Sequence, residues 1–433
     1  MSTTHSAKAF LTAALLLGLW GPLGPALAQT PAPRPGAPAS QDQVRRLLTE
    51  AEELLRAGQT AKAEGKLNEA LKRDPENVRV LVWLGEIALS KRDLAKAEGY
   101  AQRAYKSDLN YPPVRALLGM IHEQKKDLQK AEAEFKNAIL LNPSFVQAYL
   151  LLGRLYIGQG KVDQGLEQYR AAARVAPDNS GVRESLVMAY LQTGRTADAL
   201  IEVKAMVQKR PKDAALRNSL GALYGRTGDT ARAMQEFQEA LKIDPNFAPA
   251  HLNMGDNYLA QDDRPRALQS YLRAGQLAPR LAEAHWKAGD LYLADKKIDE
   301  AIAAYRRALA ASPDAVIPLI NLARIYAEER PDYKQALELA QRAERLAPAD
   351  WYVNDILGWT HYQMGKTEDA VRYLEKAKRI ESRAARIRYH LGLAYLRQGK
   401  KAAAAGELRE AVALAPNLPQ RAEIDKLLGE LPR

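Results

Sequence analysis

The chain has 433 residues, of which 27% are charged and 47% are apolar, and it contains no cysteine. Without cysteine, disulfides, thiol catalysis and cysteine-ligated metal sites are excluded. The formal net charge of +11 would suit an anionic partner, but 52 acidic residues are interleaved with 63 basic ones, which favours a solvated helical surface.

Residues 1–28 have the pattern of an export signal. Lys8 lies in a short polar start, an apolar stretch covers Ala9–Trp20, and Ala26-Leu27-Ala28 precedes a cleavage point before Gln29. The apolar stretch is shorter than the ~20 residues that span a bilayer. We therefore expect cleavage and a periplasmic or secreted mature protein, with an uncleaved anchor as the alternative. A stiff proline-rich linker is predicted over residues 29–43.

From Val44 to Leu418 a pattern of about 34 residues recurs about eleven times. Each unit has a small residue, usually glycine, at its eighth position, then a tyrosine, an alanine and a closing proline. Only the ninth unit has an extra residue, which we place in the turn from Glu328 to Tyr333. The units start at Val44, Val78, Pro112, Val146, Ser180, Ala214, Ala248, Ala282, Val316, Trp351 and Ala385.

This pattern resembles the tetratricopeptide (TPR) repeat, a helix-turn-helix unit, over roughly 375 of the 433 residues. The resemblance implies an all-α TPR solenoid, a right-handed superhelix whose concave groove is lined by the first helix of each unit and receives peptides. Such arrays are interaction scaffolds, and the repeats leave no room for a catalytic domain. We therefore expect no enzymatic activity and no cofactor.

The recurring residues also predict how the helices pack. Glycine inside a helix costs about 1 kcal/mol relative to alanine, so its recurrence at the eighth position indicates close approach of the second helix, which offers a small residue there. Two sets of aromatic residues at fixed positions are expected in the core. Glycine in the turn within a unit favours a left-handed helix end, at Gly58, Gly160, Gly194, Gly228, Gly365 and Gly399.

The ends and the junctions of the array carry further signals. Proline closes nine of the units, but Leu109 and Ser382 take its place in units two and ten, where we expect deviations from regular packing. A C-terminal capping helix is predicted within residues 419–433, because Ile424, Leu427 and Leu428 share one helical face.

Candidate binding residues follow from the resemblance, in which the second, fifth, sixth, ninth, twelfth and thirteenth positions of a unit face the groove. In the later units these positions carry aromatic, arginine and acidic side chains, which are typical anchors of protein recognition when exposed. The alternative for Trp286 and Trp359 is that they pack neighbouring first helices. We predict partner binding at Asn253, Asp256, Trp286, Asp290, Asn321, Arg324, Tyr352, Asp355, Trp359 and Tyr389.

Two other kinds of site are not expected. A carboxylate clamp needs an asparagine at the sixth position flanked by basic residues, and Glu283 stands where a basic residue would have to follow Asn253. His251 and His285 recur one repeat apart, but no third ligand shares their phase, so we predict core histidines and no metal. His390 is predicted to be isolated.

The sequence therefore predicts an exported, non-enzymatic scaffold or adaptor of the bacterial cell envelope that binds a protein or peptide. Two alternatives remain open: an accessory subunit of an envelope polysaccharide synthesis or export complex, and direct binding of an anionic polymer. Nucleic acid is not an expected partner, and membrane association is expected only through a partner or an uncleaved signal.

Overall fold

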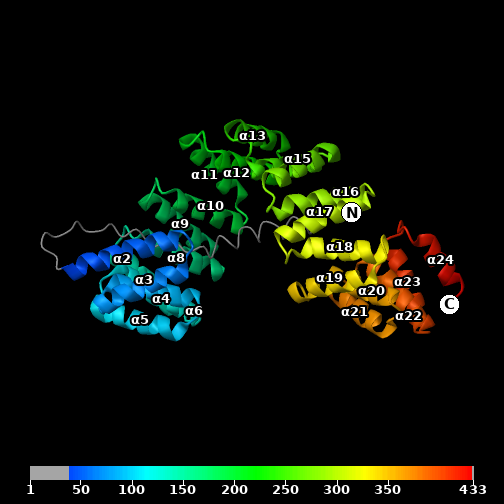
Figure 1. The fold of residues 1–433 in the computed structure, drawn as a ribbon, viewed down its shortest axis with the longest axis horizontal. Coiled ribbons are helices and arrows are strands. Elements are labelled where there is room, and N and C mark those ends of the chain that lie inside the picture. The colour runs from blue at the N-terminus through cyan, green and yellow to red at the C-terminus, as the bar shows by residue number, and fades with distance from the viewer. Residues whose placement is uncertain (1–38, 432–433) are drawn as a thin grey trace. The chain divides into compact units, whose positions relative to one another are not determined.

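The computed structural model describes residues 39–431, so the predicted export signal and residues 29–38 of the predicted linker lie outside the described residues. Over 39–431 the chain forms 23 helices and no strand (Figure 1). The all-α repeat fold expected from the sequence is confirmed. None of the helices in this range is long and apolar enough to cross a membrane.

Each unit consists of a first and a second helix joined by a short turn. From α4 onward every first helix begins at the residue that opens the corresponding unit of the sequence pattern. The first helices are α2 (Ala39–Arg56), α4 (Val78–Ser90), α6 (Pro112–Gln124), α8 (Val146–Gly158), α10 (Ser180–Gln192), α12 (Ala214–Arg226), α14 (Ala248–Ala260), α16 (Ala282–Ala294), α18 (Val316–Glu328), α20 (Trp351–Gln363) and α22 (Ala385–Arg397). The second helices are α3 (Thr60–Arg73), α5 (Leu94–Ser107), α7 (Leu128–Leu141), α9 (Val162–Val175), α11 (Thr196–Lys209), α13 (Thr230–Ile243), α15 (Arg264–Leu277), α17 (Ile298–Ala311), α19 (Tyr333–Leu346), α21 (Thr367–Ile380) and α23 (Lys401–Leu414).

Helix α2 corrects the predicted linker, because it begins at Ala39 and makes residues 39–43 helical. The last proline of this stretch is Pro38, so nothing after it opposes a helix, and Asp42 in the first turn interacts favourably with the helix dipole.

The chain divides into two compact units, one ending at Glu202 and one beginning at Val203, and α11 contains the boundary. Each of these two compact units, which contain several repeats, has its own apolar core. In the first compact unit, a buried cluster of α2, α3 and α4 includes Val44, Leu67, Leu81 and Leu84. In the second, Leu319, Val353 and Ile356 belong to a cluster of α18, α19 and α20.

The glycines at the eighth position are required by close packing, but the nearest partner differs from the expected one. A Cβ atom on Gly119 would lie 2.4 Å from Cε1 of Phe135, and one on Gly255 would lie 2.4 Å from Cε1 of Tyr271. The nearest atoms in these two units belong to an aromatic ring of the second helix, and at Gly358 and Gly392 to a leucine of that helix. The expected small residue is also close, because its backbone carbonyl lies 3.0 Å from the Cβ positions of Gly153 and Gly221. Phe135 and Tyr271 are buried, as expected for that aromatic set.

The turn inside each unit needs one residue in the left-handed region. The six glycines predicted there have φ between 70° and 82°, which confirms their role. Four other units place a larger residue in the same conformation, with φ between 58° and 63°, at Arg92, Lys126, Asp262 and Lys296. In these units the backbone conformation is retained despite the steric penalty of a Cβ atom.

The turn between units is held by the fourth residue of the following first helix. In most units this side chain contacts the backbone carbonyl six residues earlier, at the end of the preceding unit, whatever its chemical type. The contacts join Tyr149 to Pro143, Arg183 to Pro177, Arg217 to Pro211, His251 to Pro245, His285 to Pro279, Asn354 to Pro348 and Arg388 to Ser382.

This contact explains why His251 and His285 recur one repeat apart. Their Nε2 atoms lie 3.3 Å and 3.1 Å from the carbonyl oxygens of Pro245 and Pro279. Both side chains are only partly buried, so they are turn contacts and not the core histidines that the sequence suggested. The junction at Ser382 was expected to deviate, but Arg388 makes the usual contact there.

The array ends in α24 (Arg421–Gly429). Its Ile424 is fully buried against a cluster that includes Tyr389, Leu393 and Leu408 of the last unit. Helix α24 thus covers the apolar end of the repeats, as the amphipathic pattern predicted.

Candidate functional site

The ten predicted site residues lie on five first helices of the second compact unit: α14, α16, α18, α20 and α22. Asp256 is exposed, and Asn253, Asp290, Asn321, Arg324, Tyr352 and Trp359 are partly exposed. Trp286, Asp355 and Tyr389 are buried, so the expectation that these three side chains are exposed anchors is wrong. The seven accessible residues remain candidates for contact with a partner.

Hydrogen bonds and ion pairs connect these first helices. At the upstream end, Asn253 Nδ2 donates to Asn218 Oδ1 on α12 at 2.9 Å. Asp256 accepts hydrogen bonds from the Tyr271 hydroxyl at 2.7 Å and from Lys287 Nζ at 2.6 Å. Lys287 therefore ties α16 to α14, and its Nζ lies 5.7 Å from the ring centre of the buried Trp286.

Asp290 repeats this arrangement one unit later with a different neighbour. It accepts a hydrogen bond from the Tyr305 hydroxyl at 2.5 Å and one from Asn321 Nδ2, on α18, at 2.9 Å. Burial raises the pKa of Asp290 to about 6, although its hydrogen bonds and the nearby Arg324 act in the opposite direction.

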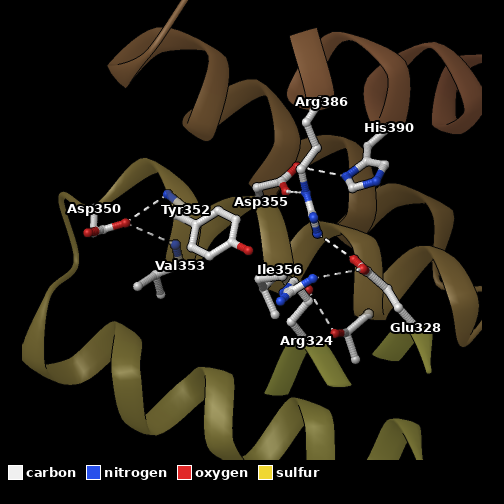
Figure 2. Close-up of polar contacts among 10 residues, drawn as sticks. Arg324, Glu328, Asp350, Tyr352, Val353, Asp355, Ile356, Arg386 and His390 are labelled. Atoms are coloured by element: carbon white, nitrogen blue, oxygen red, sulfur yellow. Dashed lines mark hydrogen bonds and ion pairs between the residues drawn. The ribbon is translucent and has the colours of Figure 1, made fainter. Parts of the chain in front are cut away.

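An ion-pair network joins α18, α20 and α22, in which Asp355 is fully buried and Arg386 and Glu328 are partly exposed. Figure 2 shows Arg386 between the carboxylates of Asp355 and Glu328. Arg386 Nε donates to Asp355 Oδ2 at 2.7 Å, and His390 Nδ1 lies 2.8 Å from Asp355 Oδ1. Because Arg386 on α22 also pairs with Glu328 on α18, the network passes over α20 and fixes three consecutive first helices.

The charges of this network offset the burial of Asp355. Burial by itself would raise the pKa of this fully buried carboxyl, but the charges of His390 and Arg386 and their hydrogen bonds lower it. Arg324 lies beside the network, with Nη1 3.9 Å from Glu328 Oε2 and with a buried Nε that has no acceptor. Arg324 is therefore the least satisfied cation of this site, and its partly exposed guanidinium is the one best able to donate to an oxygen of a partner.

An aromatic stack extends the network along α20 and α22. The ring of Trp359 stacks on His390 with centroids 4.1 Å apart and on Tyr362 with centroids 5.1 Å apart. The Tyr389 hydroxyl donates to Glu423 of α24 at 2.9 Å. Trp359 thus packs neighbouring first helices, which was the alternative reading of this residue.

Sequence reasoning missed three members of the network: Glu328, Arg386 and His390. They occupy the thirteenth, second and sixth positions of their units, which are groove positions, so the repeat phase could have indicated them. His390 was expected to be isolated, and that expectation is wrong, because it contacts Asp355 and stacks on Trp359. Within residues 39–431 no group of three side chains could hold a metal ion.

Comparisons with known proteins agree with this architecture. A family model described as "Tetratricopeptide repeat" matches residues 48–112, 252–316, 297–350 and 357–419, and a second model of that description matches residues 87–248. The chain belongs to the tetratricopeptide repeat family. TPR folds generally mediate protein–protein interaction, and TPR scaffolds are typically non-enzymatic.

Individual relatives resemble only parts of the chain or its general fold. The TPR repeat-containing protein PA4667 of Pseudomonas aeruginosa is 38% identical over 69 residues, which are 16% of this chain and 12% of that protein. Among solved structures, the Cut9–Hcn1 hetero-tetramer of the APC/C is 15% identical and aligns over 89% of this chain and 96% of its own, with a TM-score of 0.48. PilF of Pseudomonas aeruginosa is 20% identical over 50% of this chain and 99% of its own, with a TM-score of 0.44.

Proposed function

We propose that this TPR protein is a non-enzymatic adaptor of the bacterial cell envelope, which binds a partner peptide or protein along the first helices α14 to α22. The observation that supports this proposal most directly is the placement of partly exposed polar and aromatic side chains around an ion-pair network. Arg324 and Tyr352 are partly exposed, while the pair between the buried Asp355 and Arg386 fixes the first helices around them. A surface that is ordered before binding loses little entropy when a partner docks.

Arg324 is the residue best suited to test this surface. Within residues 39–431 its only ion pair, with Glu328, is long at 3.9 Å, and its Nε has no acceptor. Arg324→Gln therefore removes a binding group without breaking the Asp355–Arg386 pair. Arg307 on the second helix α17 is exposed, so Arg307→Gln is a matched loss of charge away from this surface.

The test is capture of partners from the organism's own envelope fraction with wild-type protein and both variants. We expect a partner that is retained by wild type and Arg307→Gln and is lost from Arg324→Gln. Retention by all three proteins would place the binding surface elsewhere. Recovery of an envelope glycan without protein would favour the anionic-polymer alternative, in which binding falls steeply as salt rises.

The envelope location rests on the sequence of residues 1–28 alone. Fractionation of cells that produce the full chain, with N-terminal sequencing of the mature protein, tests it separately. We expect a periplasmic protein that begins at Gln29, and recovery of an unprocessed cytoplasmic chain would refute the location without affecting the binding surface.

A further inference from the structure

In the compact unit that ends at Glu202, one junction between repeats lacks the usual contact of the fourth residue of a first helix with the carbonyl six residues earlier. Arginine occupies the fourth position of α6, α10, α12 and α22, and each of these arginines pairs with a glutamate of the following second helix. In three of them Nε also donates to the carbonyl six residues earlier. Arg115 is the exception, because its Nε is buried and has no acceptor.

The exception falls where Leu109 replaces the closing proline of the preceding unit. Arg115 keeps its ion pair with Glu134, at 3.2 Å, but its guanidinium lies over the ring of Tyr105, with Cζ 5.0 Å from the ring centre. Buried donors without a partner are rare and unfavourable in proteins, so this one requires an explanation. An oxygen supplied from outside the chain would satisfy it.

A cavity of about 290 Å³, open to the surface, is present at this junction and is lined by residues of α5, α6 and α7. Its lining residues are Gln102, Tyr105, Lys106, Arg115, Leu118 and Glu134. This volume lies at the lower limit of ligand pockets, about 300 Å³, and so suits one side chain of a partner better than a complete small molecule.

The chemistry of the lining identifies the occupant. Lys106 is exposed and has no ion pair within the described part of the chain, whereas the charge of Glu134 is engaged by Arg115. The lining therefore has one cationic charge in excess, together with an unsatisfied N–H donor. Tyr105 and Leu118 add an apolar wall.

We propose that this cavity is a second docking site, which receives an acidic side chain next to an apolar one in a segment of a partner protein. The carboxylate is held by Lys106 and the Arg115 guanidinium, and the apolar neighbour packs on Tyr105 and Leu118. The site lies in the first compact unit and does not depend on the surface that contains Arg324.

The test uses a fluorescent peptide, dansyl-Gly-Leu-Glu-Leu-Gly-amide, and the full chain, with binding followed by anisotropy. Both peptide ends are blocked, so the glutamate side chain carries the only carboxylate. We expect a dissociation constant near or below about 1 mM and at least tenfold weaker binding of the same peptide with glutamine in place of glutamate.

Two variants and two matched controls locate the binding site on the protein. Lys106→Gln alters an exposed side chain and leaves the fold intact, and Arg115→Gln removes the guanidinium; each should weaken binding about tenfold or more. Lys96→Gln lies at the other end of α5, and Arg217→Gln removes an arginine at the same repeat position whose Nε is satisfied. Both controls should bind the peptide as wild type does.

Three outcomes would overturn the proposal: no binding of the glutamate peptide, equal binding of the glutamine peptide, or equal loss of binding in the controls. The last outcome would indicate general attraction to a cationic protein. Arg324→Gln should leave binding of the peptide unchanged, so failure at the cavity and failure of the adaptor surface are distinguishable.

Discussion

At the level of single residues, Asp256 and Asp290 show how one repeat position acquires two different properties. Both accept a hydrogen bond from a tyrosine fifteen residues later. Lys287 neutralises Asp256, whereas the additional partner of Asp290 is the uncharged Asn321. An ionised carboxylate at Asp290 is therefore buried beside neutral donors, which is why burial raises its pKa to about 6.

This raised pKa gives Asp290 a measurable effect on stability. The folded protein binds a proton at Asp290 at pH values between the ordinary carboxyl pKa of 3.8 and about 6, and the unfolded chain does not. Stability therefore decreases as the pH rises through this interval. Asp290→Asn, which is neutral at every pH and still accepts from Tyr305, should remove this decrease and raise the denaturation midpoint at pH 7.5.

Urea denaturation at pH 5 and pH 7.5 measures the difference. Asp256→Asn is the control, because it changes the same repeat position but removes an ion pair, so it should retain the pH dependence of the wild type and be less stable at both pH values. A pH dependence in Asp290→Asn as large as in wild type would show that another group is responsible.

Asp355 has the opposite linkage. His390 and Arg386 lower its pKa below the ordinary value of 3.8. Its ionised form therefore contributes stability that is present above this value and is lost as the pH falls through the lower pKa of the folded protein. Asp355→Asn leaves Arg386 and His390 without their buried partner and should lower the free energy of unfolding by about 3 kcal/mol at pH 7. The exposed Arg421–Asp425 pair provides the control, since Asp425→Asn should change the free energy of unfolding by less than about 0.5 kcal/mol.

The repeat phase predicted the elements well because each helix begins at a fixed position of a strict pattern. It predicted the network only in part. Asp355 and Arg386 are both groove positions, but Arg386 pairs with Glu328, 58 residues away, and this contact depends on how three first helices pack. The repeat period predicts which positions of adjacent repeats lie next to each other. It does not predict a contact between two repeats that are separated by a third.

At the level of helices and turns, four units retain a left-handed residue without the glycine that favours it. Lys296, with φ of 58°, ends the first half of the eighth unit in this conformation. A side chain in the left-handed region is disfavoured by roughly 1–2 kcal/mol, while glycine makes the unfolded chain more flexible by roughly 0.5–1 kcal/mol. Lys296→Gly should therefore raise the free energy of unfolding by about 0.5–1 kcal/mol.

The adjacent residue provides the control for this turn. Asp295 has φ of −85°, so Asp295→Gly relieves no strain and should destabilise the protein. Thermal melting of both variants distinguishes the two effects. If both substitutions lowered the melting temperature, the turn would not be strained in solution.

At the level of the whole molecule, stability in a repeat array is the sum of each unit and its contacts with neighbouring units. The Asp355 network should therefore act locally, on the helices that it joins. In Asp355→Asn, amide hydrogen exchange should accelerate in α18, α20 and α22, and α12 should exchange as in wild type, because no contact of Asp355, Arg386 or His390 reaches that helix. Equal acceleration from α12 to α24 would show that the second unit opens as one cooperative body, and the network would then stabilise all of its repeats. Local acceleration would instead mean that the network keeps the helices that carry Arg324 and Tyr352 well ordered. Loss of Asp355 should then weaken partner binding at that surface, although the buried Asp355 does not itself contact a partner.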